Sequence, residues 1–307
     1  MAVKVAVVGS YNGGFTVKAP RLPVVGETLL GSGYVEGPGG KGSNQAVAAA
    51  RLGAEVHLVS CIGADRTGDE ALALWEREGV HVCVRRDDKA HTGMGMIFLL
   101  PEGENAILVA PGANAKLSTD DINLMEEAII GCQVLLLQLE IPVETAVHAA
   151  KIAKDHDVKV VFNPAPVQAL PAQAFRSLDV LTPNLTEARA LTGERPDSNT
   201  DVEELAGKLM RLGTRSVVVT LGKEGAFVLN QQGGVLVSAP KVKTVDSTGA
   251  GDAFNGALAV ALAQGRPLRE AAQWACYAGA HCATKLEVIP GLAHKKELSA
   301  FVEEHRL

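Results

Sequence analysis

The sequence predicts an α/β fold in which a mainly parallel sheet is covered by helices on both faces. Short apolar runs of strand length alternate along most of the chain with longer helical stretches, as in repeated β–α units. The chain has 307 residues, 47% of them hydrophobic, so it can bury a large core. Two segments, 15–36 and 92–109, interrupt the alternation with strand-like runs and no helix between them. They predict hairpins that form a second, small sheet.

Local patterns place the elements of the main layer. Short apolar runs between Gly, Pro or polar residues predict strands at 3–8, 55–60, 133–139, 159–162, 180–182 and 216–220. Helices are expected at 44–52, 67–79, 143–155, 250–263 and 268–284. The first of these helices is Ala-rich, and Gly53 follows it as a stop signal.

Composition excludes several classes of protein. The net charge is −6, from 29 basic and 35 acidic residues, and no basic block suggests a nucleic-acid platform. The five cysteines have no CxxC spacing, which favours reduced packing residues over disulfides or zinc. No signal peptide is recognisable, and no apolar stretch approaches the roughly 20 residues that cross a bilayer. We therefore expect a cytoplasmic protein without nucleic-acid or membrane partners.

The strongest functional signal is the run from Val245 to Gly256, which leads from small residues through a carboxylate into an apolar helix. Its glycines allow a ligand to approach the backbone closely, and the first amides of a helix can bind an anion. Asp252 would be a proton acceptor beside a phosphate held there. This combination indicates phosphoryl transfer to an alcohol. The structural alternative is a favourable charge at a helix N-terminus.

A second glycine-rich run, from Gly37 to Gly42, matches GxGxxG and precedes a helix. A dinucleotide site with Asp65 as its distant acid is therefore a rival interpretation. A Rossmann fingerprint belongs after the first strand, which ends here at Val8, so the position argues against that interpretation. Lys41 within the run favours a hydroxylated or phosphorylated ligand, and a turn that caps an Ala-rich helix is the structural alternative. The chain has no GxxxxGK[ST] motif, which excludes a P-loop.

Two stretches, Gly39–Ala46 and Asp246–Asp252, together resemble the two signatures of the PfkB, or ribokinase-like, carbohydrate kinases. Further matches in the same order, such as Gln138-Leu139-Glu140, extend the resemblance over nearly the whole chain. It implies a ribokinase-like three-layer α/β/α sandwich, a single domain over 1–307. A β lid would be formed from about 11–37 and 91–112, and two lids would clasp each other in a homodimer.

The resemblance implies an ATP-dependent kinase that acts on a pentose-like sugar; with ribose the product would be ribose 5-phosphate. Asp252 would be the general base. Gly249, Ala250, Gly251 and the amide of Asp252 would form the anion hole for the transferred phosphoryl group. The first residues of a helix keep a carboxylate ionised, so Asp252 would be a weak base, which a loose transition state tolerates.

Further positions match the family's ligand-binding residues. The resemblance assigns the sugar hydroxyls to Asn12, Gly40, Lys41, Asn44 and Glu140. It assigns the nucleotide and Mg²⁺ to Asn184, Glu187, Thr220, Gly222 and Cys276. For Asn184 and Glu187 a helix cap with a capping box is the structural alternative, and both roles can coexist. A monovalent cation, K⁺, would lie near Asp246, Thr248, Cys282 and Lys285.

Two departures from the family pattern affect the substrate and the ion. The family's Asn-x-Asp reads Asn12-Gly13-Gly14 here, so the carboxylate that would bind vicinal sugar hydroxyls is missing. Losing such a contact costs about 1.5–3 kcal/mol, unless another acid reaches the site. In the cation segment Glu287 replaces a glycine and Gly291 replaces a hydroxyl residue, which leaves activation by K⁺ open.

Three functions are therefore compatible with the sequence. A sugar kinase fits best, and a nucleoside kinase or another kinase of the same family is the nearest alternative. A binding or regulatory protein that lost turnover is the alternative from a different class. The missing acid at position 14 motivates it, and the intact Asp252 argues against it.

Overall fold

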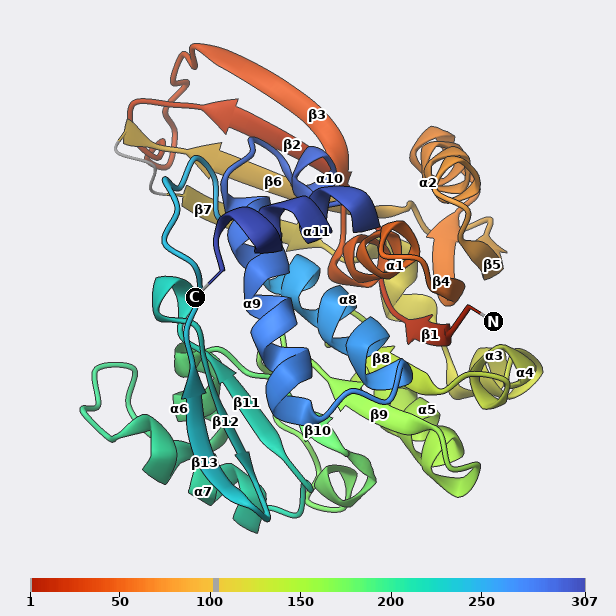
Figure 1. Cartoon of the computed structure of the whole chain (residues 1–307). Coiled ribbons are helices and arrows are strands. Elements are labelled where there is room, and N and C mark those ends of the chain that lie inside the picture. The colour runs from red at the N-terminus through yellow and green to blue at the C-terminus, as the bar shows by residue number, and fades with distance from the viewer. Residues whose placement is uncertain (1, 102–104, 307) are drawn as a thin grey trace.

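The computed structural model describes residues 2–101 and 105–306. It contains a large sheet between two layers of helices and a second, small sheet at one end of it (Figure 1). This arrangement confirms the predicted α/β/α architecture with an additional small sheet.

The large sheet has nine strands. They are β1 (Lys4–Val8), β4 (Glu55–Gly63), β5 (His81–Asp87), β8 (Val134–Leu137), β9 (Lys159–Phe162), β10 (Val180–Leu181), β11 (Val217–Thr220), β12 (Ala226–Asn230) and β13 (Gly233–Val237). Their order is β13-β12-β11-β10-β9-β8-β1-β4-β5. All neighbours from β11 to β5 are parallel, whereas β12 and β13 add an antiparallel edge. The carboxyl ends of the parallel strands therefore meet along one edge, where open α/β sheets bind ligands.

Side-chain alternation along the strands produces the two cores. Val5 and Val7 of β1 face one hydrophobic cluster, and Ala6 and Val8 face the other. The first cluster packs against α1 (Lys41–Arg51), α2 (Arg66–Arg77), α8 (Ala250–Ala263), α9 (Leu268–Ala283), α10 (Val288–Gly291) and α11 (Lys295–Glu304). The second packs against α3 (Thr119–Leu124), α4 (Glu127–Ile130), α5 (Val143–Asp155), α6 (Leu185–Leu191) and α7 (Val202–Arg211). A sheet that is apolar on both faces must be covered on both, which explains the continuous apolar strands.

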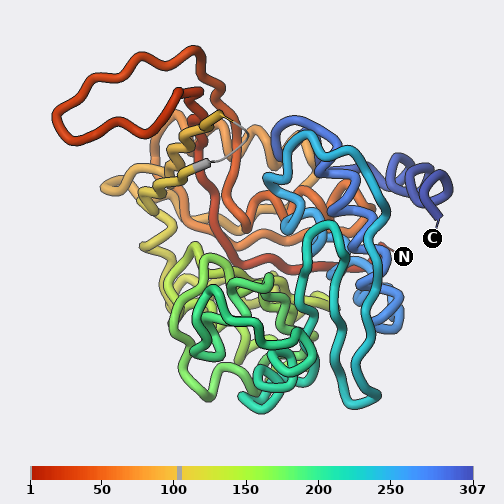
Figure 2. Tube along the Cα trace, turned by 90° about the vertical axis from the view of Figure 1, so that its left-hand side faces the viewer, coloured from red at the N-terminus to blue at the C-terminus, as the bar shows by residue number. Residues whose placement is uncertain are grey.

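The small sheet has the order β3-β2-β6-β7. Its strands are β2 (Asn12–Lys18), β3 (Gly33–Gly39), β6 (Gly93–Leu99) and β7 (Asn105–Ala110). It combines the two expected hairpins, β2–β3 and β6–β7, joined by parallel pairing of β2 with β6. The connection 19–32 extends away from the body of the molecule (Figure 2). Residues 102–104 of the expected 91–112 segment lie outside the described residues.

Most predicted elements of the main layer are confirmed, with shifted ends. Helices 143–155 and 250–263 and strand 159–162 have the predicted bounds. Helix α1 begins at Lys41, three residues before the expected 44, because the glycine-rich run reaches only to Gly40 before the helix forms. Strands β5, β12 and β13 were not predicted.

Two expectations from composition can be compared with the structure. All five cysteines are free, and four of them are buried, as packing residues are. Among the described residues, no helix is both long enough and apolar enough to cross a bilayer.

Candidate active site

Asp252 is buried at the start of α8, and α1 supplies both of its side-chain donors. Asn44 donates from Nδ2 to Oδ2 of Asp252 at 2.8 Å, and Gln45 donates from Nε2 to Oδ1 at 3.0 Å. The Asp252 side chain is therefore tied to the helix that follows the first glycine-rich run. These two hydrogen bonds fix the orientation of the carboxylate at the start of α8.

The helix start beside Asp252 has the geometry of an anion site. Gly249 caps α8 with a left-handed φ of 79°, and a Cβ there would collide with the Val288 side chain. The first bond of the helix runs from the amide of Ala253 to the carbonyl of Gly249 at 2.8 Å. The amides of Gly251 and Asp252 precede that bond and are available to a ligand. The amide of Ala250 instead donates to Ser247 at 3.2 Å, which closes the preceding turn.

Buried polar residues link Asp252 to the ends of three parallel strands. Gln138 after β8 donates to Oε1 of Gln45 at 2.7 Å, and Gln45 also donates to Oδ1 of Asn163 after β9 at 3.2 Å. Asn163 in turn donates to the carbonyl of Thr182 after β10 at 3.1 Å. Sequence reasoning gave this network no role. The available signal was a polar residue just after each apolar strand.

A second cluster surrounds Glu140, which follows β8 at the same edge of the sheet. Oε2 of Glu140 accepts hydrogen bonds from Oγ of Ser10 at 2.6 Å, from the amide of Lys41 at 2.9 Å and from Nδ2 of Asn12 at 3.3 Å. Asn114 holds Asn12 from the other side, because its Nδ2 donates to Oδ1 of Asn12 at 2.8 Å. The structure thus brings the predicted sugar residues Asn12, Lys41 and Glu140 together.

Gly40 joins this cluster to α1 and cannot be replaced without strain. Its φ is 89°, and a Cβ would lie 2.7 Å from the amide nitrogen of Asn12 and from Cα of Tyr11. Real Cβ atoms do not approach backbone atoms so closely. The tight turn places Lys41 at the start of α1 and Asn44 one turn later, so both clusters are positioned by one helix.

The charges of the two clusters converge on Lys41. Burial lowers the pKa of Lys41, but the carboxylates of Asp252, Glu140 and Glu187 raise it more, so the pKa lies above its usual value. The ammonium therefore stays protonated and offsets three acids. The pKa of Glu187 lies above its usual value, chiefly because the side chain is buried, and the charge of Asp252 raises it further. The amide of Asn184 and the charge of Lys41 lower it by less.

The predicted nucleotide residues Asn184, Thr220 and Gly222 lie together beside α6. Oδ1 of Asn184 accepts from the amide of Glu187, and Oε2 of Glu187 accepts from the amide of Asn184, both at 2.8 Å. The capping box that was the structural alternative is therefore present, and a magnesium role stays a prediction. A parallel bridge pairs Asn184 with Thr220, and Gly222 follows with a φ of 59°.

Cys276 is buried within α9, in the core that α9 shares with α8, and its place beside the nucleotide stays a prediction. Burial raises the pKa of its thiol to about 12. A thiol in this state is a packing group and not a nucleophile.

The predicted cation residues form one contact between the loop before α8 and the end of α9. Oδ1 of Asp246 accepts from the amide of Thr248 at 2.9 Å, and Sγ of Cys282 contacts the carbonyl of Thr248 at 3.7 Å. The amide of Lys285 donates to the carbonyl of Cys282 at 3.1 Å. A Cβ at Gly291 would lie 2.8 Å from Sγ of Cys282, so Cys282 explains the missing side chain there. In residues 2–101 and 105–306 no group of three or more His, Cys, Asp or Glu residues could hold a metal ion.

The two departures from the family pattern, Gly14 and Glu287, both lie where the backbone is closely packed or strained. Gly14 lies in a row of glycines, paired with Gly37 of β3 on one side and Gly95 of β6 on the other. A Cβ at Gly14 would lie 3.1 Å from the carbonyl of Gly37, which is close contact. Glu287 has φ 66° and ψ 157°, a conformation almost confined to glycine that costs about 1–3 kcal/mol.

The dinucleotide interpretation does not fit the structure. The strand before the GxGxxG run is β3, which belongs to the small sheet and not to the parallel sheet. Asp65 caps α2, where it accepts from the amides of Gly68 and Thr92, each at 2.8 Å. Asp65 is therefore a structural residue.

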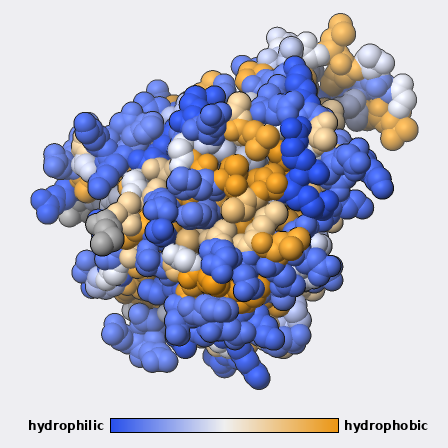
Figure 3. All heavy atoms as spheres, turned by 90° about the vertical axis from the view of Figure 1, so that its right-hand side faces the viewer, coloured by the Kyte–Doolittle hydropathy of each residue, from blue (hydrophilic) through white to orange (hydrophobic). Residues whose placement is uncertain are grey.

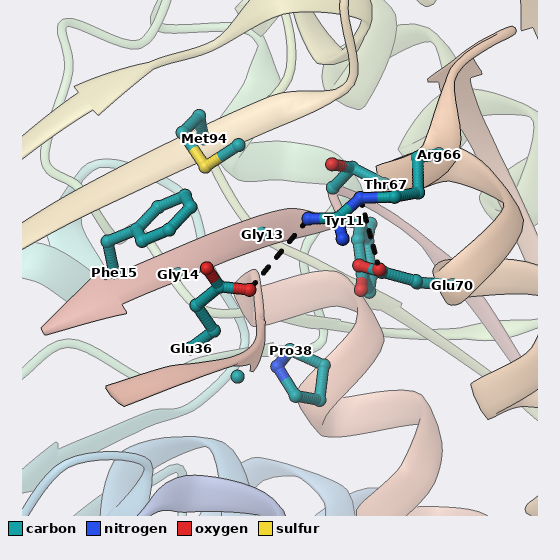
Figure 4. Close-up of a pocket in the computed structure, with 11 residues that line it drawn as sticks. Tyr11, Gly13, Gly14, Phe15, Glu36, Pro38, Arg66, Thr67, Glu70 and Met94 are labelled. Atoms are coloured by element: carbon teal, nitrogen blue, oxygen red, sulfur yellow. Dashed lines mark ion pairs between the residues drawn. The ribbon is translucent and has the colours of Figure 1, made fainter. Parts of the chain in front are cut away.

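A cavity of about 290 Å³ lies between the small sheet and the start of α2 (Figure 4). Its lining includes Gly13, Phe15 and Met94, whose register positions alternate with Asn12 and Gly14 along the sheet. The side chains of Phe15 and Met94 thus face away from Glu140. The lining also includes Gly14 and Gly37, but neither Asp252 nor Glu140.

A family model described as pfkB family carbohydrate kinase matches residues 2–295, and the chain belongs to this family. It is 36% identical to ribokinase from Haemophilus influenzae over 304 residues, 99% of each chain. It is 36% identical to deoxyribokinase from Salmonella typhi over 257 residues, 83% of this chain and 84% of that one. The structure of Arabidopsis thaliana ribokinase with ribose and ATP is 32% identical, with a TM-score of 0.90 over 99% of each chain. The chain is thus a carbohydrate kinase with the ribokinase fold.

Proposed function

We propose that this chain is an ATP-dependent ribokinase, which converts ribose and ATP to ribose 5-phosphate and ADP. The observation that carries the proposal is the buried Asp252, fixed by Asn44 and Gln45 beside the free amides at the start of α8. Relatives named ribokinase, one of them solved with ribose and ATP, support the choice of substrates.

The proposed reaction is an in-line displacement. The carboxylate of Asp252 accepts the proton of the sugar's 5-hydroxyl as that oxygen forms a bond to the γ-phosphorus. The bond from the γ-phosphorus to the bridging oxygen breaks, and ADP leaves with its electron pair. The amides of Gly251 and Asp252 stabilise charge on the transferred phosphoryl group. The Lys41 ammonium offsets the carboxylates that surround the reacting groups.

The ions are part of the proposal. Magnesium would be held by ATP and, through water, by Glu187, where it offsets phosphate charge. The residue fits this role because its capping bond uses Oε2, so Oε1 can bind a water. Potassium is proposed beside Asp246 and the carbonyls of Thr248 and Cys282. The carbonyl of Thr248 meets the Cys282 thiol and has a second lone pair for a cation.

The small sheet is proposed to act as a lid over the sugar and as the dimer contact. It holds Asn12 above Glu140, and its outer strand β7 exposes apolar side chains. Closure over the sugar would exclude water, which limits wasteful hydrolysis of ATP. We place the reaction in the cytoplasm, since the five cysteines are free.

A second acceptor, 2-deoxyribose, is favoured by one observation. Gly14 offers no carboxylate to a hydroxyl, and unless another acid replaces it the site would reject a sugar lacking that hydroxyl only weakly. A relative named deoxyribokinase is as similar to this chain as one named ribokinase, at 36% identity for both.

A substrate screen tests the proposal. ADP release and product identity are measured with ATP and ribose, 2-deoxyribose, hexoses and nucleosides. We expect the highest kcat/KM for ribose. A nucleoside as best acceptor would replace ribokinase by nucleoside kinase. Ligand-induced thermal stabilisation without any ADP would instead establish the binding or regulatory function.

A further inference from the structure

We propose that Glu287 recognises the sugar, supplying from the loop after α9 the carboxylate that β2 lacks at position 14. The inference deepens the proposed sugar-kinase function and rests on it. It concerns which side chain binds the sugar hydroxyls and not whether phosphoryl transfer occurs.

The backbone of Glu287 suggests that its side chain has a purpose. Its φ of 66° and ψ of 157° are almost confined to glycine, and glycine is what the family pattern has at this position. A Glu at this position keeps the backbone conformation of a glycine, at the cost of backbone strain, and adds a carboxylate. Such outliers cluster at active sites and ligand clamps.

The loop around Glu287 is fixed next to the anion site. The amide of Glu287 donates to Oδ2 of Asp246 at 3.2 Å. The next residue, Val288, packs against Gly249, the residue that caps α8. Glu287 therefore lies between the start of α8 and the small sheet.

The carboxylate of Glu287 is directed to the face of the small sheet that bears Asn12. Its Oε2 lies 3.9 Å from where a Cβ of Gly37 would be. Gly37 pairs with Gly14, and cross-strand partners point to the same face. Gly14 is two residues from Asn12, so both point to the face on which Asn12 donates to Glu140. The added acid and the missing acid thus share one face, in adjacent strands.

The row Gly95–Gly14–Gly37 leaves space beneath this face, because no side chain fills it. Within the described ranges, the hydrogen bond that Glu287 makes uses its amide, and its exposed carboxylate enters no ion pair. An ionised carboxylate only accepts hydrogen bonds, and sugar hydroxyls are donors of the right kind. A sugar between Glu140 and the glycine row would meet both Asn12 and Glu287, which lie on the same face of the small sheet.

Steady-state kinetics of four variants tests the inference. They are Glu287→Gln, Glu287→Gly, Gly14→Asp and the double variant Gly14→Asp/Glu287→Gln. Glu287→Gln should raise the KM of ribose about ten- to a hundredfold, as expected for a lost charge-assisted contact, with the KM of ATP unchanged. Its preference for ribose over 2-deoxyribose should fall. In the double variant the KM of ribose should recover.

Glu287→Gly and one control variant separate binding from folding. Glu287→Gly should lose ribose affinity like Glu287→Gln but melt at a higher temperature, because the strain is relieved. Glu270→Gln, an exposed acid at the other end of α9, should change neither quantity. An unchanged ribose KM in Glu287→Gln, or an effect confined to ATP or to activation by K⁺, would overturn the inference. If the wild type phosphorylates no pentose, the proposed function itself is wrong. This outcome is measured on the wild type, before any variant is compared with it.

Discussion

At the scale of single residues, Asp252 depends on amide donors from one neighbouring helix. Asp252 and Glu140 could be identified from sequence because each sits in a recognisable motif. The contributions of Gln45 and Gln138 could not, since a glutamine inside an apolar segment has no spacing that reveals its partner. Which side chains meet across the ends of β8 and β9 is decided by the packing of α1 on the sheet.

Replacing Asp252 by Asn should remove the proton acceptor and leave the fold intact. We expect kcat to fall by about 10²–10⁴ or more, with ADP binding nearly unchanged in calorimetry. The variant can fold because Asn44 can rotate its Oδ1, a buried atom without a partner in the described structure, toward the new amide. Equal losses of turnover and nucleotide binding, with a lower melting temperature, would indicate folding damage instead.

At the scale of elements, apolar runs and helix-forming stretches predicted the main layer well. The edge strands were harder, because β13 includes exposed positions and β5 is exposed at its start. Their sequences lack the continuous apolar pattern of a strand covered on both faces. The start of α1 was missed because glycine and lysine at 40–42 read as a loop, while Gly42 in fact packs inside the first turn.

The turn after β5 should make the stability of the fold depend on pH in the acid range. The amides of Lys89 and Ala90, together with Arg85, lower the pKa of Asp87 from 3.8 to about 2. Because the pKa is lower in the folded state, the ionised Asp87 stabilises the fold. This stabilisation is complete above pH 3.8 and is lost as the pH falls through about 2. Urea midpoints should therefore drop between pH 5 and pH 2, and less so in Asp87→Asn.

The neighbouring exposed acid provides the control for this experiment. Asp88→Asn removes an equal charge from the same turn and should leave the pH dependence of the wild type unchanged. If both variants behave alike, the amides around Asp87 do not hold its carboxylate.

At the scale of the whole molecule, the small sheet and the segment 19–32 expose apolar side chains. Ile107 and Leu108 on β7 are 57% and 65% exposed. The projecting segment 19–32 also carries exposed Val25 and Leu30, and hydrophobic side chains are visible on that extension in Figure 3. Adjacent exposed apolar residues are typical of a protein interface.

Charges on β7 should therefore separate the proposed dimer. In sedimentation analysis we expect Ile107→Lys/Leu108→Lys to shift the protein from dimer to monomer. Leu236→Lys, at a 53% exposed site on the opposite edge of the large sheet, is the matched control and should stay dimeric. A wild type that sediments as a monomer at all concentrations would rule out the lid contact.

The short turn at Gly40 joins β3 of the small sheet directly to α1, the helix that holds Asp252. Strand β3 ends at Gly39 and α1 starts at Lys41, so a tilt of that strand turns the first residues of the helix. Those residues carry the amide that reaches Glu140 and, one turn on, the donors that grip Asp252. In the proposed lid closure, a sugar that draws the small sheet toward Glu140 would therefore also move the first turn of α1, and with it the Asn44 and Gln45 donors at Asp252.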